Sequence, residues 1–205
     1  MQIILASDSP RRKQLLGLLV PEFTAVSHQV NEDEYQGTTA EDLVGQLAVA
    51  KATSIPVTKG DIVIGSDLVV AKRDKFMSKP KDLNQAREYL KLLSGKTHTV
   101  FCGVAVAGKN KTLMSVAQSQ VKMKNYDEKI IDAYIKKFHV LDKGGAYAIQ
   151  FELPGYGSLV ESFVGGITTI IGLPLDHLAN LLKEFGVKPP ADWSKQCKIE
   201  TDYEF

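Results

Sequence analysis

The chain has 205 residues, of which 44% are hydrophobic and 24% charged, and its formal net charge is +1. This composition is typical of a globular protein long enough to bury a sizeable core. The nearly balanced charge argues against a nucleic-acid partner, and no apolar run approaches the length of a membrane span. The two cysteines, Cys102 and Cys197, lack metal-site spacing, and Met1-Gln2 leads straight into an apolar segment. We therefore expect a cytoplasmic protein without a signal peptide.

The opening stretch predicts a strand that runs directly into the N-terminus of a helix. The apolar run Ile3-Ile4-Leu5 stops at Ser7-Asp8-Ser9, and Pro10 suits the first turn of a helix that Ser9 caps. That turn contains Arg11-Arg12-Lys13, although the positive end of the helix dipole favours acidic residues there. Two interpretations stay open. Either these cations and the free backbone N–H groups hold a phosphate, or they form a solvated basic turn or pair with distant carboxylates.

An acidic cluster follows a segment, residues 22–30, that reads as a strand with poor alternation. The cluster, Asn31-Glu32-Asp33-Glu34, is either a solvated loop or a source of a metal or water ligand, for which Glu32 is the candidate.

The next helix is expected to begin at a capping box, Thr38-Thr39-Ala40-Glu41. Its apolar stripe includes Leu47, and Lys51 lies one turn further along, beside that stripe rather than opposite it. The lysine either extends its ammonium into water or directs it into a cleft.

The segment from Asp61 to Ala71 is predicted to be a strand buried on both faces. It contains Gly65-Ser66-Asp67, and a carboxylate within an apolar run is costly unless another group pairs with it. The glycine indicates a bulge or the close approach of a neighbouring element. The competing interpretation is a turn between two short strands; we prefer a functional role for Asp67.

The rest of the chain mixes strands and helices without strict alternation, which predicts an α/β or α+β fold around a large mixed sheet. His98 is expected to be a core histidine, and Gln150 can present both a donor and an acceptor to a base edge. The expected elements are a hairpin turn at 73–75, a helix capped by Asp82 or Asn84, helices that follow Asp127 and Pro174, strands over 96–107, 113–123, 159–164 and 167–171, and a loosely attached polar tail over 188–205.

Several of these stretches together resemble the Maf family, nucleoside triphosphate pyrophosphatases whose fold is related to that of inosine triphosphatases. The resemblance spans the chain to about Gly186. The matching motifs are Leu5-Ala6-Ser7 with Ser9-Pro10-Arg11-Arg12, Leu47-Ala48 with Lys51-Ala52, Gly65-Ser66-Asp67, Lys79-Pro80, Leu93-Ser94-Gly95 with His98, Gly145-Ala146-Tyr147 with Ile149-Gln150, and Gly172-Leu173-Pro174.

The resemblance implies a single domain over residues 1–187, made of two lobes around a nucleotide-binding cleft, with a large twisted mixed sheet flanked by helices. It implies a homodimer that hydrolyses a nucleoside triphosphate to the monophosphate and pyrophosphate with a divalent cation, Mg²⁺ or Mn²⁺. Such an enzyme prevents the incorporation of unwanted nucleotides.

The resemblance also assigns roles to individual residues. Asp67 is the implied proton acceptor, and Lys51 and Lys79 act with it at the phosphates. Ser7 and Arg12 align with further phosphate contacts, and Glu32 with an acidic residue associated with the metal, which Asp67 also helps to hold. Arg11, Leu68 and Gln150 stand at the three positions that separate substrate classes.

Two of these three positions carry the residues usual in the dTTP/UTP class, Arg11 and Gln150, whereas Leu68 replaces a threonine. Gly144 replaces a usual alanine, and Gly165-Gly166-Ile167-Thr168-Thr169 stands where the family often has Gly-Ser-Tyr-Ser-Asn. We expect dTTP and UTP as substrates, with modified pyrimidine nucleotides accepted too. The alternatives are a 7-methyl-GTP pyrophosphatase of the same family and a non-catalytic nucleotide-binding regulator of septum formation.

Overall fold

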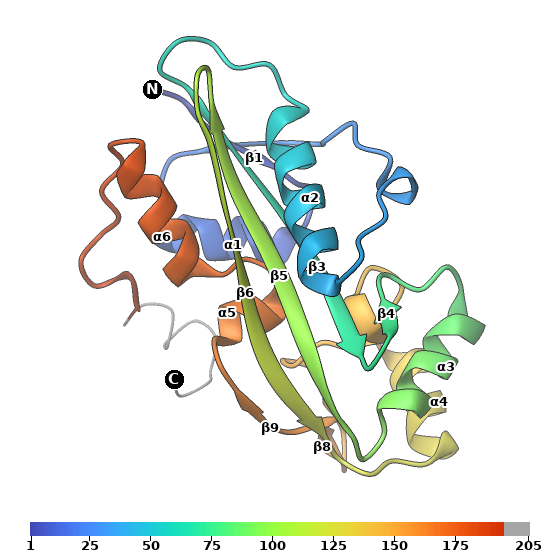
Figure 1. The fold of residues 1–205 in the computed structure, drawn as a ribbon. Coiled ribbons are helices and arrows are strands. Elements are labelled where there is room, and N and C mark those ends of the chain that lie inside the picture. Colours follow the sequence, from blue (N-terminus) through green and yellow to red (C-terminus); the bar gives the residue numbers. More distant parts are fainter. Residues whose placement is uncertain (195–205) are drawn as a thin grey trace. The chain divides into compact units, whose positions relative to one another are not determined.

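A computed structural model describes residues 1–194 (Figure 1). The helices are α1 (Pro10–Leu19), α2 (Ala40–Thr53), α3 (Leu83–Leu93), α4 (Glu128–Lys137), α5 (Ile167–Ile171) and α6 (Leu175–Glu184), with two short 3₁₀ helices, η1 (Glu32–Glu34) and η2 (Gly144–Ala146). The strands are β1 (Ile3–Ala6), β2 (Thr24–Val26), β3 (Ile62–Lys72), β4 (Lys75–Met77), β5 (Thr97–Gly108), β6 (Thr112–Met123), β7 (Glu152–Leu153), β8 (Gly157–Ser158) and β9 (Val160–Val164). Among these residues, no helix has the length and apolar character needed to cross a bilayer.

Seven strands form one mixed sheet, in the order β2-β1-β3-β5-β6-β9 with β4 paired to β3. Strand β1 runs parallel to both β2 and β3, whereas β4 is antiparallel to β3 and β9 is antiparallel to β6. A separate antiparallel pair is formed by β7 and β8. The predicted mixed α/β architecture, a large sheet flanked by helices, is therefore confirmed.

The chain divides into two compact units. Among the described residues, unit 1 comprises residues 1–67, 101–117 and 166–194, and unit 2 comprises residues 68–100 and 118–165. The long strands β3, β5 and β6 each contribute one part to each unit, and the division within β3 falls between Asp67 and Leu68.

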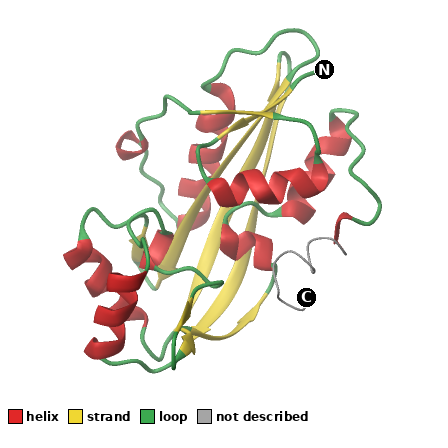
Figure 2. Ribbon diagram, turned by 180° about the vertical axis from the view of Figure 1, so that it is seen from behind, coloured by secondary structure: helices red, strands yellow, loops and turns green. Residues whose placement is uncertain are grey.

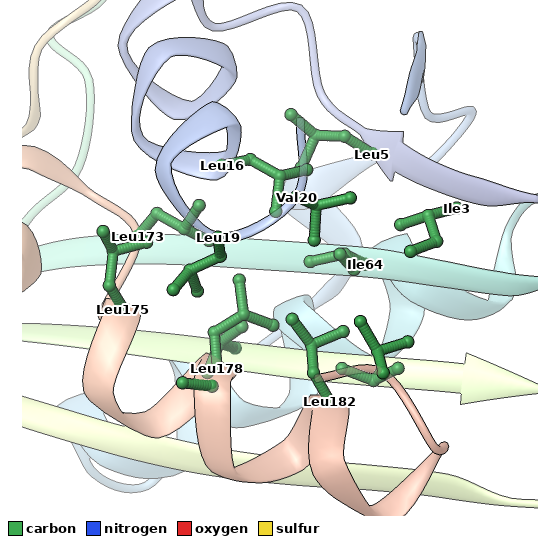
Figure 3. Close-up of a cluster of buried hydrophobic side chains, with 14 of the residues drawn as sticks. Ile3, Leu5, Leu16, Leu19, Val20, Ile64, Leu173, Leu175, Leu178 and Leu182 are labelled. Carbon is green, nitrogen blue, oxygen red and sulfur yellow. The ribbon is translucent and has the colours of Figure 1, made fainter. Parts of the chain in front are cut away.

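The core of unit 1 lies between helices α1 and α6 and one face of the strands (Figure 3). Leu16 and Leu19 of α1 pack against Leu178 and Leu182 of α6 and against Ile64 of β3. All five are almost fully buried. Burial of a leucine or isoleucine side chain stabilises a fold by about 1.5–3 kcal/mol, so this cluster fixes the helix that carries the basic first turn.

Helix α2 covers the opposite face of the unit 1 strands (Figure 2). Along β5, Val104 and Val106 face the α1–α6 cluster, whereas Ala105 and Ala107 pack against Ala48 and Ala52 of α2. This alternation is the period of two expected of a strand buried on both faces. The small residues between α2 and the strands allow the helix to approach the sheet closely.

Gly65 of β3 is one of the points at which α2 comes close to the sheet. A Cβ at this position would lie 2.4 Å from the carbonyl oxygen of Ala48 and from the amide nitrogen of Ala52. The glycine within the buried strand therefore marks the close approach of a neighbouring element, one of the two predicted meanings. Because Gly65-Ser66-Asp67 continues through β3, the alternative of a turn between two short strands is wrong.

Unit 2 is built on helices α3 and α4, which lie side by side (green and yellow in Figure 1). Asp127 caps α4, as predicted, and Asp82, one of the two predicted candidates, caps α3. The fully buried side chains of this unit include Leu90 and Leu93 of α3 and Tyr134 of α4.

The structure corrects three sequence predictions in unit 1. Residues 167–171 form helix α5 and not a strand, because Gly166 begins a helical turn and Gly172, with φ of +120°, ends it. The predicted strand over residues 22–30 is reduced to Thr24–Val26. Helix α2 is capped by Thr39, whose side chain accepts a hydrogen bond from the Asp42 amide, and Asp42 in return accepts one from the Thr38 amide.

The predicted tail begins as part of the packed fold. Trp193 packs against the α1–α6 cluster, in which Val187 is buried. The chain therefore stays attached to unit 1 up to this tryptophan, and the remainder of the predicted tail, residues 195–205 with Cys197, lies outside the described residues.

Candidate functional site

A buried lysine between two carboxylates is the centre of the candidate site in unit 1. The Lys51 Nζ lies 2.5 Å from Asp67 Oδ1 and 2.7 Å from Glu32 Oε1. Lys51 is 1% exposed and the Asp67 side chain 11%, whereas the Glu32 side chain is 34% exposed. Of the two interpretations of Lys51, the structure supports an ammonium directed inward, and it places Glu32 in this site.

The local structure of each element explains this arrangement. Lys51 lies one helical turn after Leu47, on the face of α2 that packs against the sheet. Asp67 follows Gly65 and Ser66 in β3, opposite that helix. Glu32 comes from η1, whose first turn Asn31 caps, and its carboxylate also lies 3.7 Å from His28 Nε2.

A second group of residues surrounds the start of α1. Leu5 of β1 pairs with Ile64 of β3, so Ser7 and Ser66 both lie two residues beyond this pair. Ser7 is buried, and its Oγ accepts a hydrogen bond from the Ser9 amide at 3.2 Å. Ser9 in turn caps α1 through the Arg12 amide, as predicted.

One backbone carbonyl joins Arg12 to β3. The Arg12 Nε donates to the Gly172 oxygen at 2.8 Å, and the Ser66 hydroxyl lies 3.0 Å from the same oxygen and 2.8 Å from the Gly103 oxygen. Sequence reasoning assigned no role to Ser66 or Gly172. The signal that could have identified Ser66 is its hydroxyl within a buried apolar run, which must find a hydrogen-bond partner.

Cys102 lies beside this group without being reactive. Its thiol is fully buried, 3.5 Å from the Ser66 hydroxyl. Burial raises the pKa of the Cys102 thiol to about 11, against the opposing influence of the Arg12 charge. The thiol therefore stays protonated and inert at neutral pH.

Unit 2 contains the other predicted site residues, Leu68, Lys79 and Gln150. Leu68 is half-buried, and Lys79 and Gln150 are exposed. The Gly145 amide donates to the Ser78 carbonyl at 3.3 Å, which joins the segment before Lys79 to the loop that leads to Gln150. The structure thus divides the predicted residues into two sets: Ser7, Arg11, Arg12, Glu32, Lys51 and Asp67 in unit 1, and Leu68, Lys79 and Gln150 in unit 2.

Buried polar bonds hold the loop before Gln150 in a strained conformation. Gly145 and Ala146 both have positive φ, +68° and +64°, which is costly for alanine. On the following residues, the Tyr147 hydroxyl lies 2.7 Å from His98 Nε2, and the Ala148 amide donates to the Tyr134 hydroxyl at 3.1 Å. These anchors fix the residues from which Gln150 projects.

His98 is a core histidine, as predicted. It is 3% exposed, and burial lowers its pKa to about 4, with a smaller contribution from the Lys72 charge. The imidazole is therefore neutral at physiological pH.

Known proteins provide an independent comparison. Among solved structures, the chain is similar to the Ham1 protein of Staphylococcus aureus, with a TM-score of 0.49 and 16% identity, covering 90% of this chain and 97% of that one. It is 39% identical over 188 residues to a Bacillus cereus protein named dTTP/UTP pyrophosphatase, covering 91% of each chain, and 38% identical to a Bacillus anthracis protein of the same name, covering 91% of this chain and 96% of that one. The family model described as "Maf-like protein" matches residues 2–185. This chain belongs to the Maf family.

Proposed function

We propose that the protein hydrolyses nucleoside triphosphates, dTTP and UTP in particular, to the monophosphate and pyrophosphate. The observation that carries the proposal is the Asp67 carboxylate, nearly buried and paired with the Lys51 ammonium at 2.5 Å. Membership of the Maf family and the names of the relatives, dTTP/UTP pyrophosphatase, support the same reaction and substrate class.

In the proposed reaction Asp67 accepts a proton from a water molecule that attacks the α-phosphorus. A new bond forms between the water oxygen and phosphorus as the bond from phosphorus to the α–β bridging oxygen breaks, and pyrophosphate leaves with that oxygen. Lys51 compensates the charge of the carboxylate and orients it. A positioned base of this kind typically contributes 10²–10⁴-fold to the rate.

Ser7 and Arg12 are assigned to the phosphates in unit 1, and Lys79 in unit 2. The start of α1 offers backbone N–H groups and the positive end of the helix dipole, both of which favour a bound anion. The Arg12 guanidinium is held through its Nε by the Gly172 carbonyl. Its planar fork suits bidentate contact with phosphate oxygens.

Glu32 and Asp67 are the residues proposed to hold a divalent cation. Within residues 1–194, no group of three or more histidine, cysteine, aspartate or glutamate side chains forms a metal site. A pair of carboxylates nevertheless fits Mg²⁺ or Mn²⁺, since Mg²⁺ in nucleotide enzymes is held by one or two carboxylates and by substrate phosphates. When bound, the cation would neutralise negative charge on the phosphates.

Gln150, with Arg11 and Leu68, is assigned to recognition of the base. Its amide presents a donor and an acceptor, which complement the carbonyl and N3–H groups of thymine and uracil. The bonds that anchor residues 145–148 support this assignment, because a side chain that reads a base edge needs a fixed backbone.

The deciding experiment measures pyrophosphate release from dTTP, UTP, CTP and 7-methyl-GTP, with Mn²⁺, with Mg²⁺ and with EDTA. We expect kcat/KM to be highest for dTTP and UTP and activity to be lost in EDTA. Preference for 7-methyl-GTP would assign the chain to the other substrate class, and binding without pyrophosphate release would favour the regulator.

Two variants connect this activity to the site. We expect Asp67→Asn to lower kcat by about 10²-fold or more, because the proton acceptor is lost. Asp33→Asn, which changes an exposed carboxylate of η1, is the matched control and should retain activity. Near wild-type activity in Asp67→Asn would remove this residue from the mechanism.

The proposed homodimer and the cytoplasmic location stay predictions. Sedimentation of the purified protein at several concentrations tests the homodimer, and fractionation of cells that express it tests the location.

A further inference from the structure

The side chain of Leu68 occupies the place that a side chain at residue 144 would need. A Cβ on Gly144 would lie 2.7 Å from Leu68 Cδ2, well inside the closest separation that real Cβ atoms show. The next nearest atoms, the carbonyl oxygens of Met77 and Leu68, are 3.8 and 3.9 Å away, which is ordinary contact. Among the described residues, the terminal methyl of Leu68 is therefore the one neighbour that a Cβ at residue 144 would meet at less than ordinary contact distance.

The backbone does not explain the glycine at position 144. The adjacent Gly145 has φ of +68°, a conformation that favours glycine, and a Cβ there would lie 3.0 Å from Val70. Gly144, in contrast, is not among the residues with positive φ. The missing Cβ at position 144 thus accommodates the Leu68 side chain, whereas Gly145 is required by its own conformation.

The contact joins two functional segments. Leu68 directly follows the proposed proton acceptor in β3, and Gly144 begins the loop that leads to Gln150. The next residue of that loop, Gly145, donates its amide to the carbonyl of Ser78, immediately before Lys79. A shift at the contact of residues 68 and 144 would therefore be transmitted to the base-recognition side chains.

We infer that Leu68 and Gly144 form one specificity-determining element, in which the absence of a Cβ at residue 144 sets the rotamer of Leu68 beside the base. This inference rests on the proposed function and adds Gly144 to the residues that select the nucleotide. Threonine has no δ-methyl group, so an alanine at position 144 would not meet one, whereas the δ-methyl of Leu68 would have to move.

A double-mutant cycle tests the coupling. It compares the wild type with Leu68→Thr, Gly144→Ala and the double variant, in thermal unfolding and in the ratio of kcat/KM for dTTP and dUTP, which differ by the 5-methyl group alone. We expect Gly144→Ala alone to lower Tm by about 3 °C or more, because the added methyl displaces Leu68. The same change should shift the dTTP/dUTP ratio about tenfold, since one misplaced methyl in a pocket has an effect of this size.

In the Leu68→Thr background, the same Gly144→Ala change should alter Tm by no more than about 1 °C and the dTTP/dUTP ratio by no more than about twofold, each relative to the Leu68→Thr variant. Gly145→Ala is the matched control: its effect on Tm should be equal in both backgrounds, because its cause is the backbone. If Gly144→Ala changes Tm equally in both backgrounds, residues 68 and 144 are not coupled. If its effect on Tm depends on residue 68 but the dTTP/dUTP ratio is unchanged, the two residues do not determine specificity. The Tm cycle needs no turnover, so failure of the proposed reaction is distinguished from failure of this contact.

Discussion

Replacing Lys51 with methionine is expected to destabilise the protein as well as to impair catalysis. The substitution keeps most of the apolar side-chain volume but removes the ammonium that lies 2.5 Å from Asp67 and 2.7 Å from Glu32. If Lys51 only bound phosphates, as the sequence alone would suggest, its removal would not lower the stability of the protein. Because Lys51 is 1% exposed, its removal leaves the Asp67 carboxylate nearly buried without its compensating charge.

The magnitude follows from the burial of each partner. Removal of one member of a buried ion pair costs about 3–5 kcal/mol, because the other charge stays desolvated. Glu32 is 34% exposed, and solvent screens its pair with Lys51, so Glu32→Gln should cost no more than about 1 kcal/mol. The double variant Lys51→Met with Asp67→Asn should be more stable than Lys51→Met by about 2 kcal/mol, because it contains no uncompensated carboxylate.

Urea unfolding followed by circular dichroism measures these differences, with Lys59→Met as the control for loss of an exposed lysine. The control should lie within about 0.5 kcal/mol of the wild type. Two results would contradict this expectation: a Lys51→Met variant as stable as the wild type, or an Asp67→Asn change that destabilises the Lys51→Met variant as much as it does the wild type. Either result would mean that the ammonium reaches solvent.

Three further expectations concern the surroundings of the site. Gly65→Ala should cost about 1–3 kcal/mol and lower activity, because its Cβ meets the α2 backbone at 2.4 Å. In the same unfolding assay Gly17→Ala should stabilise the protein by about 0.5–1 kcal/mol, because its Cβ would meet no described atom within 4 Å beyond its chain neighbours and the backbone of its own helix. The pKa of His98 is lowered from 6.5 to about 4 in the folded protein. Between these two pH values the unfolded chain binds a proton at His98 that the folded protein does not bind. The free energy of unfolding therefore falls as the pH falls from 6.5 to about 4. The loss of unfolding free energy amounts to about 3 kcal/mol. When unfolding is measured at pH 7.5 and 4.5, the His98→Phe variant should lack this part of the pH dependence. A pH dependence equal to that of the wild type would mean that other groups cause the loss. Arg12→Lys keeps the charge but loses the Nε bond to Gly172, so the KM for dTTP should rise about tenfold or more, and an unchanged KM would remove Arg12 from phosphate binding.

Much of the fold could be predicted because local signals and tertiary contacts agree. The Ser9-Pro10 start of α1, the buried β3 and the aspartate caps of α3 and α4 each depend on a side chain and its immediate neighbours. Residues 167–171 were misassigned because their β-branched composition favours a strand, whereas flanking glycines and burial of Ile167 and Ile170 stabilise a short helix.

The candidate site was predicted residue by residue but not contact by contact. A carboxylate in an apolar run and a lysine beside an apolar stripe each require a partner, and these requirements identify Asp67 and Lys51. That each is the partner of the other depends on the approach of α2 to β3 at Gly65, which no local pattern specifies. The same limit applies to Leu68 and Gly144, which are 76 positions apart in the sequence and whose contact is visible only in the folded chain.

The first turn of α1 places positive side chains at the positive end of the helix dipole, an arrangement that is unfavourable unless an anion binds there. Arg12 donates to the carbonyl of Gly172, and this neutral acceptor leaves the positive charge of the guanidinium near the helix N-terminus. Lys51, in contrast, already balances Asp67 and Glu32, and these three groups together carry a formal charge of −1. A triphosphate would add charge of the same sign to such a cluster. Under the proposed function additional cations would be needed for it to bind, and the basic turn of α1, together with a divalent ion, would provide them. This electrostatic balance favours the phosphate-binding interpretation of Arg12 over a solvated basic turn.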